Sequence, residues 1–244
     1  LFSAKFLNRK TEKEKVDIYF ARSNILHKEK KYHESSKNLQ LANKLKLALY
    51  PSDCNLLIKK TNLLLVETEK IKKIAISQSK YPQNIFIVGM PRSGTTLIES
   101  VLSLNKDLKD LGEVNILEKT FKESRKLNHK ISLQELNIQE INKLARGFRI
   151  TSNKWLYNYQ YAGIIASQIP NSKIIYCYRN PLDNILSIYR TNFAKDNEYS
   201  SSLIDCAIIY LDHKQLMNEY KKRFPENIYD LNYDLLVTNP DKEI

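Results

Sequence analysis

The sequence predicts an α/β protein with a P-loop-like parallel sheet flanked by helices, preceded by an N-terminal all-α, repeat-like helical hairpin. Residues 1–80 contain no glycine and a single proline, Pro51, and their pattern indicates helices only. From Asn84 onward, short apolar runs alternate with helical patterns, as in a doubly wound parallel sheet. The apolar run Lys173–Tyr178 is typical of a strand that is covered on both faces.

The N-terminal segment is expected to form two helices joined by a polar turn near Lys30. This hairpin resembles one degenerate tetratricopeptide repeat, in which Arg22 and Lys30 replace the usual leucine and glycine. A plain helical hairpin is the alternative, and it stays open. Because a lone repeat cannot bury its own face, we expect it to pack on further repeats upstream or on the domain that follows. It could also contact a partner protein.

The chain is therefore divided into a helical, degenerate tetratricopeptide-like segment at 1–80 and a second domain at 81–244, which we interpret as C-terminally incomplete. A helix at Glu67–Ser79 is expected to end at the break Tyr81-Pro82. The elements expected after it are strand Ile85–Val88, helix Gly94–Leu104, a helix behind the capping box Ser132/Glu135, strand Ile150–Ser152, helix Asn158–Ile169, strand Lys173–Tyr178, a helix from Pro181, helix Ser201–Phe224 and strand Asn227–Leu231. In the helix 201–224 the residues expected to face inward are Leu203, Ala207, Tyr210, Leu211 and Met217.

Composition narrows the classes of function. The formal net charge is +12, but the lysines are spread along helices and no basic run is interleaved with aromatic residues, which argues against nucleic-acid binding. Neither the three cysteines nor the four histidines have the spacing of a disulfide framework or a metal site, so we expect a reducing compartment and no metal. No run of eighteen apolar residues is present, and the chain is assigned to the cytoplasm. Because it begins at Leu1 rather than Met, a signal or anchor upstream stays open.

The most informative stretch is Phe86–Ser100, in which a strand, a turn and a helix start follow one another. Gly89 and Gly94 have the G-x-x-x-x-G spacing of a phosphate-binding loop, but Thr95 stands where a nucleotide triphosphatase has lysine. The backbone NH groups of such a loop, with a helix N-terminus behind them, still form an anion site. Arg92 supplies the positive charge instead. The loop therefore predicts a nucleotide whose 5′ end is not a magnesium triphosphate.

A second candidate anion site follows the strand at 173–178. Arg179 stands at the carboxyl end of this strand, Asn180 is a natural N-cap, and Pro181 suits the first helical position. Ser187 lies two helical turns beyond Asn180, so its hydroxyl shares a helix face with the cap. A guanidinium and a hydroxyl at such a place suit a phosphate monoester. On these residues alone, an arginine that ties the strand end to a loop and a solvent-facing serine are the alternative.

Together the two sites resemble the sulfotransferase superfamily. Its 5′-phosphosulfate loop is similar to Gly89–Leu97 (GMPRSGTTL), and its 3′-phosphate-binding segment is similar to Arg179–Ser187 (RNPLDNILS). The branch that looks closest is that of the bacterial sulfotransferases with tetratricopeptide repeats, which are similar to protein-tyrosine sulfotransferases. The resemblance implies 3′-phosphoadenosine 5′-phosphosulfate as donor and no metal. It implies that the donor is bound by the following residues: Arg92, Ser93, Gly94, Thr95, Thr96, Arg179, Ser187 and Tyr233.

The resemblance also implies catalytic residues. Glu113, in the pair Gly112-Glu113, matches the family's general base; a glutamate at a helix start is the alternative. Lys154 occupies the place of a lysine that stabilises the leaving group, although Trp155-Leu156 follow it where the family usually has a proline. Arg92 would neutralise charge that builds in the transition state.

The acceptor is expected to be a hydroxyl on a tyrosine, a sugar or a small molecule. The net positive charge of the chain suggests acidic peptides or glycans as acceptors. Tyr157, Tyr159 and Tyr161 could line the acceptor cleft, but three aromatic residues at a spacing of two cannot share one helix face, so some are expected to pack in the core. Two other functions remain as alternatives: a kinase or nucleotide triphosphatase with a degenerate P-loop, and a non-catalytic helical-repeat scaffold.

Overall fold

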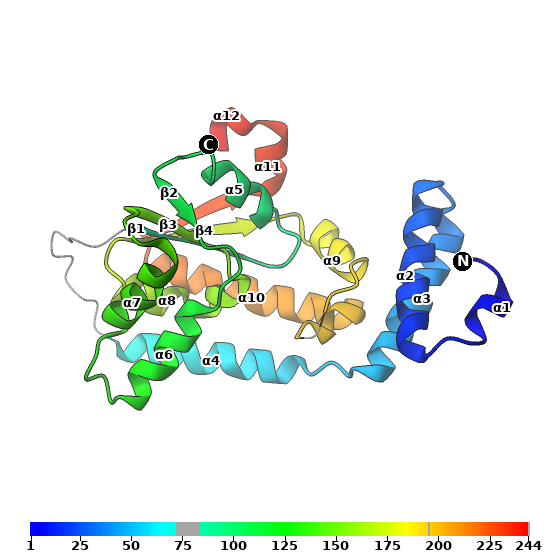
Figure 1. Ribbon diagram of the computed structural model, residues 1–244, viewed down its shortest axis with the longest axis horizontal. Coiled ribbons are helices and arrows are strands. Elements are labelled where there is room, and N and C mark those ends of the chain that lie inside the picture. The colour runs from blue at the N-terminus through cyan, green and yellow to red at the C-terminus, as the bar shows by residue number, and fades with distance from the viewer. Residues whose placement is uncertain (72–82, 195, 244) are drawn as a thin grey trace. The chain divides into compact units, whose positions relative to one another are not determined.

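The computed structural model describes residues 1–71, 83–194 and 196–243 (Figure 1). The chain forms two compact units. The first consists of residues 1–58 and 181–211, and the second of residues 59–180 and 212–244. The expected helix at 67–79 is seen only as far as Lys70, where α4 (Cys54–Lys70) ends; the rest of it and the break at Tyr81-Pro82 lie outside the described residues. The division at residue 80 stays a prediction.

The first unit is helical, and its hairpin has the predicted form. Its elements are α1 (Ala4–Leu7), α2 (Glu12–Lys28), α3 (Tyr32–Leu49), α9 (Pro181–Tyr189), the 3-10 helix η2 (Glu198–Ser201), the start of α4 and the first part of α10 (Leu203–Arg223). Lys30, in the turn between α2 and α3, has a φ of 61°, the left-handed conformation for which glycine is usual. Small residues lie where the two helices meet: the Ser35 hydroxyl donates to the Ser23 carbonyl over 2.8 Å.

The second unit contains a five-stranded sheet in which all strands are parallel. The strands are β1 (Gln83–Gly89), β2 (Leu108–Asp110), β3 (Ile150–Asn153), β4 (Ser172–Tyr178) and β5 (Ile228–Asn232), in the order β2-β3-β1-β4-β5. Gly89 is in register with Cys177, and Tyr178 with Asn232. The loops that follow β1, β4 and β5 therefore leave the sheet at one edge. The sequence did not predict β2.

Helices cover both faces of this sheet. They are α5 (Thr95–Leu102), α6 (Ile116–Lys126), α7 (Leu133–Ala145), the 3-10 helix η1 (Leu156–Tyr161), α8 (Ala162–Gln168), α11 (Tyr233–Thr238) and α12 (Pro240–Glu243). Figure 1 shows α5 and α11 on one side of the sheet and α8 and α10 on the other. Residues of β4 that point to opposite faces of the sheet pack in two different hydrophobic cores. Ile174 packs with η1, α8 and α10, and Cys177 packs with α5 and α11. The fold class predicted from the sequence is confirmed.

Two details differ from the prediction. The segment expected as one helix at 158–169 is a 3-10 turn followed by α8. Leu203 and Leu211, expected to face inward, are 48% and 64% exposed. In the described part of the chain, no helix is both long and apolar enough to cross a bilayer.

Candidate functional site

The loop between β1 and α5 is held in a strained conformation. Arg92 has a φ of 67° and Gly94 a φ of 97°. A left-handed arginine costs about 1–2 kcal/mol, which the surrounding structure must offset. The Ser93 hydroxyl donates to the Met90 carbonyl over 2.7 Å and closes the turn. A Cβ on Gly89 would lie 2.4 Å from the Cys177 carbonyl oxygen, so only glycine lets the loop pass this close to β4.

The N-terminus of α5 is open to an anion. Gly94 is the N-cap residue and has no side chain, and the first turn of α5 has no side-chain cap. The first NH groups of a helix have no intrahelical acceptor, and the helix dipole adds a partial positive charge there. Thr95 is buried, whereas Thr96 is exposed at the same turn. The backbone therefore has the geometry of an anion-binding loop without a lysine at its end.

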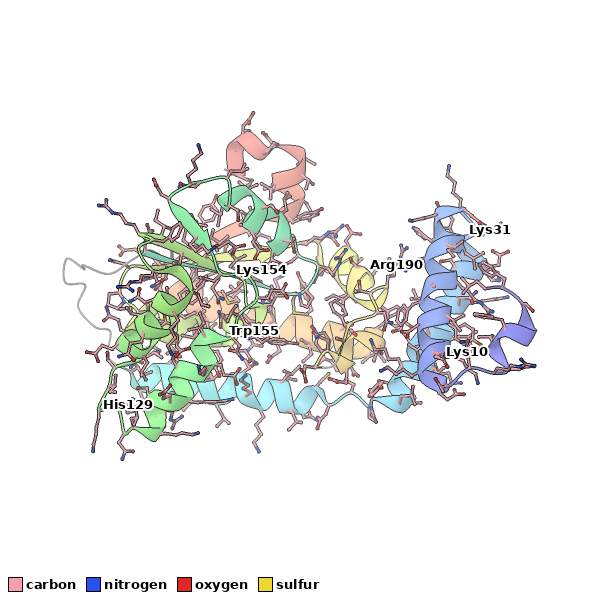
Figure 2. The ribbon with its side chains drawn as sticks, in the orientation of Figure 1. Lys10, Lys31, His129, Lys154, Trp155 and Arg190 are labelled. Carbon is pink, nitrogen blue, oxygen red and sulfur yellow. The ribbon has the colours of Figure 1, made fainter. Side chains whose placement is uncertain are left out.

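The ammonium of Lys154 joins three segments of the second unit. Its Nζ lies 3.2 Å from Thr96 Oγ1, 2.9 Å from Glu113 Oε1 and 2.9 Å from Glu99 Oε2. Lys154 is buried, and Figure 2 marks it beside Trp155. Burial disfavours the charged form of Lys154, but the hydrogen bonds that its ammonium donates to Glu99 and Glu113 outweigh this effect and raise the pKa of Lys154 above its ordinary value. Three of the predicted residues, Thr96, Glu113 and Lys154, thus come together.

Glu113 is exposed because of the turn that carries it. Gly112 has a φ of 65°, which favours glycine, and the Glu113 side chain is 61% exposed. The Asn153 amide donates to the carbonyls of Gly112 (3.2 Å) and Val114 (2.9 Å) and fixes the turn to the end of β3. Sequence reasoning missed Asn153 and Glu99, because an asparagine after a strand and a glutamate on a helix have no signature of their own.

A second cluster connects Arg179 with the loop through Tyr233. The Arg179 guanidinium lies over the Tyr233 ring, 4.9 Å from its centroid. The same ring packs on Gly94, where a Cβ would lie 2.3 Å from Tyr233 Cδ2. Asp234 lies 3.7 Å from Arg179 Nε and accepts the Asn180 backbone NH over 2.8 Å. The parallel register explains this meeting, since β1, β4 and β5 end at one edge.

The remaining predicted residues are Ser187 and the three tyrosines. Ser187 is on α9 in the first unit, where its carbonyl accepts from the Thr191 hydroxyl over 2.8 Å. Its convergence with Arg179 stays a prediction. Tyr159 and Tyr161 are 3% and 2% exposed, so these two pack in the core, as the spacing argument allowed. Within residues 1–71, 83–194 and 196–243, His, Cys, Asp and Glu side chains form no group of three that could hold a metal ion.

A family model described as "Sulfotransferase family" matches residues 82–146 and 122–244, more than half of the chain. The chain belongs to the sulfotransferase family. The matched range contains the β1–α5 loop, Glu113, Lys154, Arg179 and Tyr233.

Comparisons with individual proteins add context to this family assignment. An uncharacterized protein of Aquifex aeolicus (strain VF5) is 32% identical over 189 residues; the match covers 68% of this chain and 25% of that protein, so the chain spans about a quarter of the relative's length. Among solved structures, the sulfotransferase STF1 of Mycobacterium tuberculosis H37Rv is 10% identical with a TM-score of 0.47, over 86% of this chain and 73% of that one. STF9 of Mycobacterium avium is 13% identical with a TM-score of 0.45, over 86% and 69%. Both scores are below 0.5, and the family assignment rests on the family model.

Proposed function

We propose that this chain transfers a sulfuryl group from 3′-phosphoadenosine 5′-phosphosulfate to an acceptor hydroxyl. The observation that carries the proposal is the position of Lys154. Its ammonium contacts Thr96 at the anion loop and Glu113 at an exposed turn, so the group that would steady the leaving phosphate also touches the group that would take the acceptor's proton. Thr95, in place of the lysine of a triphosphatase, favours this reaction over phosphoryl transfer.

The residues present fit such a donor. The uncapped start of α5 and Arg92 would hold its 5′-phosphate, and Arg179, supported by Tyr233 and Asp234, would hold its 3′-phosphate. The donor supplies an activated S–O bond. As the acceptor oxygen bonds to sulfur, Glu113 accepts the hydroxyl proton, and the bond from sulfur to the phosphate oxygen breaks. Arg92, Lys154 and the loop NH groups stabilise the charge that develops on that oxygen.

The acceptor is proposed to be a hydroxyl-bearing molecule that carries acidic groups, such as an acidic peptide or glycan. The net charge of +12 would raise the local concentration of such a molecule. Because this attraction is screened by salt, transfer to acidic acceptors should weaken as ionic strength rises.

The test is a transfer assay with donor labelled in its sulfate, screened over tyrosine peptides, glycans and small phenols. Loss of a general base lowers the rate by roughly 100-fold or more, so Glu113→Ala should nearly abolish transfer. Glu123→Ala is the matched control, because Glu123 is an exposed glutamate on α6, away from the loop. Equal transfer by Glu113→Ala and the parent would remove Glu113 as the base. A parent that binds the nucleotide product but transfers to no acceptor would contradict the proposed reaction.

A further inference from the structure

Glu99 is a half-buried carboxylate beside the proposed site, and the proposed reaction gives it no step. It lies on α5, one turn beyond Thr96, and its side chain is 14% exposed. Its Oε2 lies 2.9 Å from Lys154 Nζ. Its Oε1 is buried and has no hydrogen-bond partner among the described residues. A carboxylate oxygen that is buried and left without a hydrogen-bond partner is costly, so its presence calls for a reason.

Lys154 is shared by two carboxylates that differ in access. An ammonium has three hydrogens to donate, and Glu99, Glu113 and Thr96 provide three acceptors. Glu113 is 61% exposed and stands on a turn, where an acceptor hydroxyl can reach it. Glu99 is only 14% exposed and lies on a helix, where it is less accessible to an acceptor than Glu113 is. The pair therefore provides one carboxylate for the acceptor and one that stays with the lysine.

The proposed reaction removes the charge of Glu113 but not that of Glu99. When Glu113 takes up a proton it becomes neutral, and its ion pair with Lys154 is lost. A buried ammonium without a counter-ion would tend to lose its own proton at that moment, when its charge is needed at the leaving phosphate. Glu99 is then the remaining carboxylate within 3 Å of Lys154 among the described residues.

We propose that Glu99 is a positioning residue, which keeps the Lys154 ammonium protonated and in place at the anion loop while Glu113 takes up the acceptor proton. This inference rests on the proposed function. It also follows that a second negative charge stays close to the loop, so Glu99 supports turnover at some expense of affinity for an anionic nucleotide.

The Glu99 charge should affect the pH at which Lys154 loses its proton. The charged groups that contact Lys154 are Glu99 from α5 and Glu113 from the turn after β2. Arg92 stands in the loop that leads into α5. Both carboxylates raise the pKa of Lys154 against the effect of burial. Removal of the Glu99 charge should therefore lower that pKa. Activity that needs the ammonium should then be lost at a lower pH than in the parent.

The experiment compares the parent with Glu99→Gln, which keeps the shape and removes the charge, and with Glu99→Asp, which keeps the charge. The Lys154 side chain is titrated by NMR in protein labelled at its lysines, and its signal is assigned by its absence in Lys154→Arg. In Glu99→Gln the Lys154 pKa should fall by about one unit or more, a tenfold change in its proton affinity, and Glu99→Asp should recover most of the shift. The alkaline limb of the kcat profile should move by the same amount, while magnesium-free affinity for adenosine 3′,5′-bisphosphate stays the same or improves.

An unchanged Lys154 pKa in Glu99→Gln would overturn the inference. So would a loss of kcat in Glu99→Gln with no shift of the alkaline limb, because that pattern is expected of a residue that only packs. Glu123→Gln is the control for removal of a glutamate charge from a helix of the same unit, and it should leave the Lys154 pKa unchanged. The titration needs no turnover. If the parent transfers no sulfuryl group, the proposed function fails, and the titration still decides on Glu99.

Discussion

The ring of Tyr233 lies against both candidate phosphate sites. It packs on Gly94 of the loop and carries the Arg179 guanidinium on its face. A cation over an aromatic ring contributes about 0.5–2 kcal/mol, and the ring also closes the space beside a glycine that tolerates no Cβ. The Tyr233 ring thus holds Arg179 beside the loop.

Tyr233→Ala should raise the Kd for adenosine 3′,5′-bisphosphate about tenfold, because Arg179 loses its support and Gly94 loses its packing. Tyr233→Phe should bind like the parent, since the ring rather than the hydroxyl contacts Arg179 and Gly94. Calorimetric titration of both variants measures the effect. Parent-like binding by Tyr233→Ala would show that the ring does not hold Arg179 in a binding position.

At this scale the sequence predicted residues that sit in a motif and missed those that support them. Arg92 and Arg179 were found because the loop spacing and the strand–cap–proline pattern mark them. Glu99, Asn153 and Asp234 were not found, because each acts through a contact with a residue far away in the sequence. Such contacts depend on strand order, which one sequence does not reveal.

Among the elements, β1 and β4 were predictable and β2 was not. The inward face of α10 was predicted in part: Tyr210 and Met217 are buried, whereas Leu203 and Leu211 are exposed. Seven-residue apolar strands are visible as runs, whereas β2 has three residues, of which only Leu108 is buried. In α10 the buried face includes Cys206, Ile209, His213 and Tyr220. Because His213 is polar, it interrupts the helical spacing of apolar residues from which an inward face is predicted.

His213 is fully enclosed on α10. Its ring centroid lies 4.4 Å from that of Tyr159 and 5.3 Å from that of Tyr176, and neither ring nitrogen has a hydrogen-bond partner among the described residues. Burial lowers the pKa of His213 to about 3. Below pH 6.5 His213 is therefore protonated in the unfolded chain but stays neutral in the folded chain. The stability that is present above pH 6.5 is lost progressively as the pH falls toward 3.

The expected loss from His213 between pH 7.5 and pH 5 is about 2 kcal/mol of unfolding free energy. His213→Leu, which cannot be protonated and leaves no unsatisfied nitrogen, should show a smaller loss by this amount. Urea unfolding of both proteins at the two pH values measures it. Equal losses in the parent and in His213→Leu would mean that this histidine is not the group that titrates on unfolding.

For the whole molecule, the sequence predicted an α/β class with a parallel sheet, and the structure has it. The division at residue 80 stays a prediction, and the compact units group residues 181–211 with 1–58. Composition and periodicity detect where helices give way to strands, but they do not detect which distant segments pack together. The family model begins at residue 82, so the helical segment before it has no assignment beyond its own pattern.

We propose that the chain binds both ends of a 3′,5′-bisphosphate nucleotide without magnesium. Calorimetric titration of adenosine 3′,5′-bisphosphate in the presence of a chelator tests this proposal. The variants are Arg92→Ala and Arg179→Ala, and Arg146→Ala, an exposed arginine at the end of α7, is the matched control. Each lost charge-assisted contact is worth about 1.5–3 kcal/mol, so each site variant should bind at least tenfold more weakly while the control binds like the parent. Parent-like binding by both site variants, or binding that requires magnesium, would show that these two arginines do not bind the nucleotide in the proposed way.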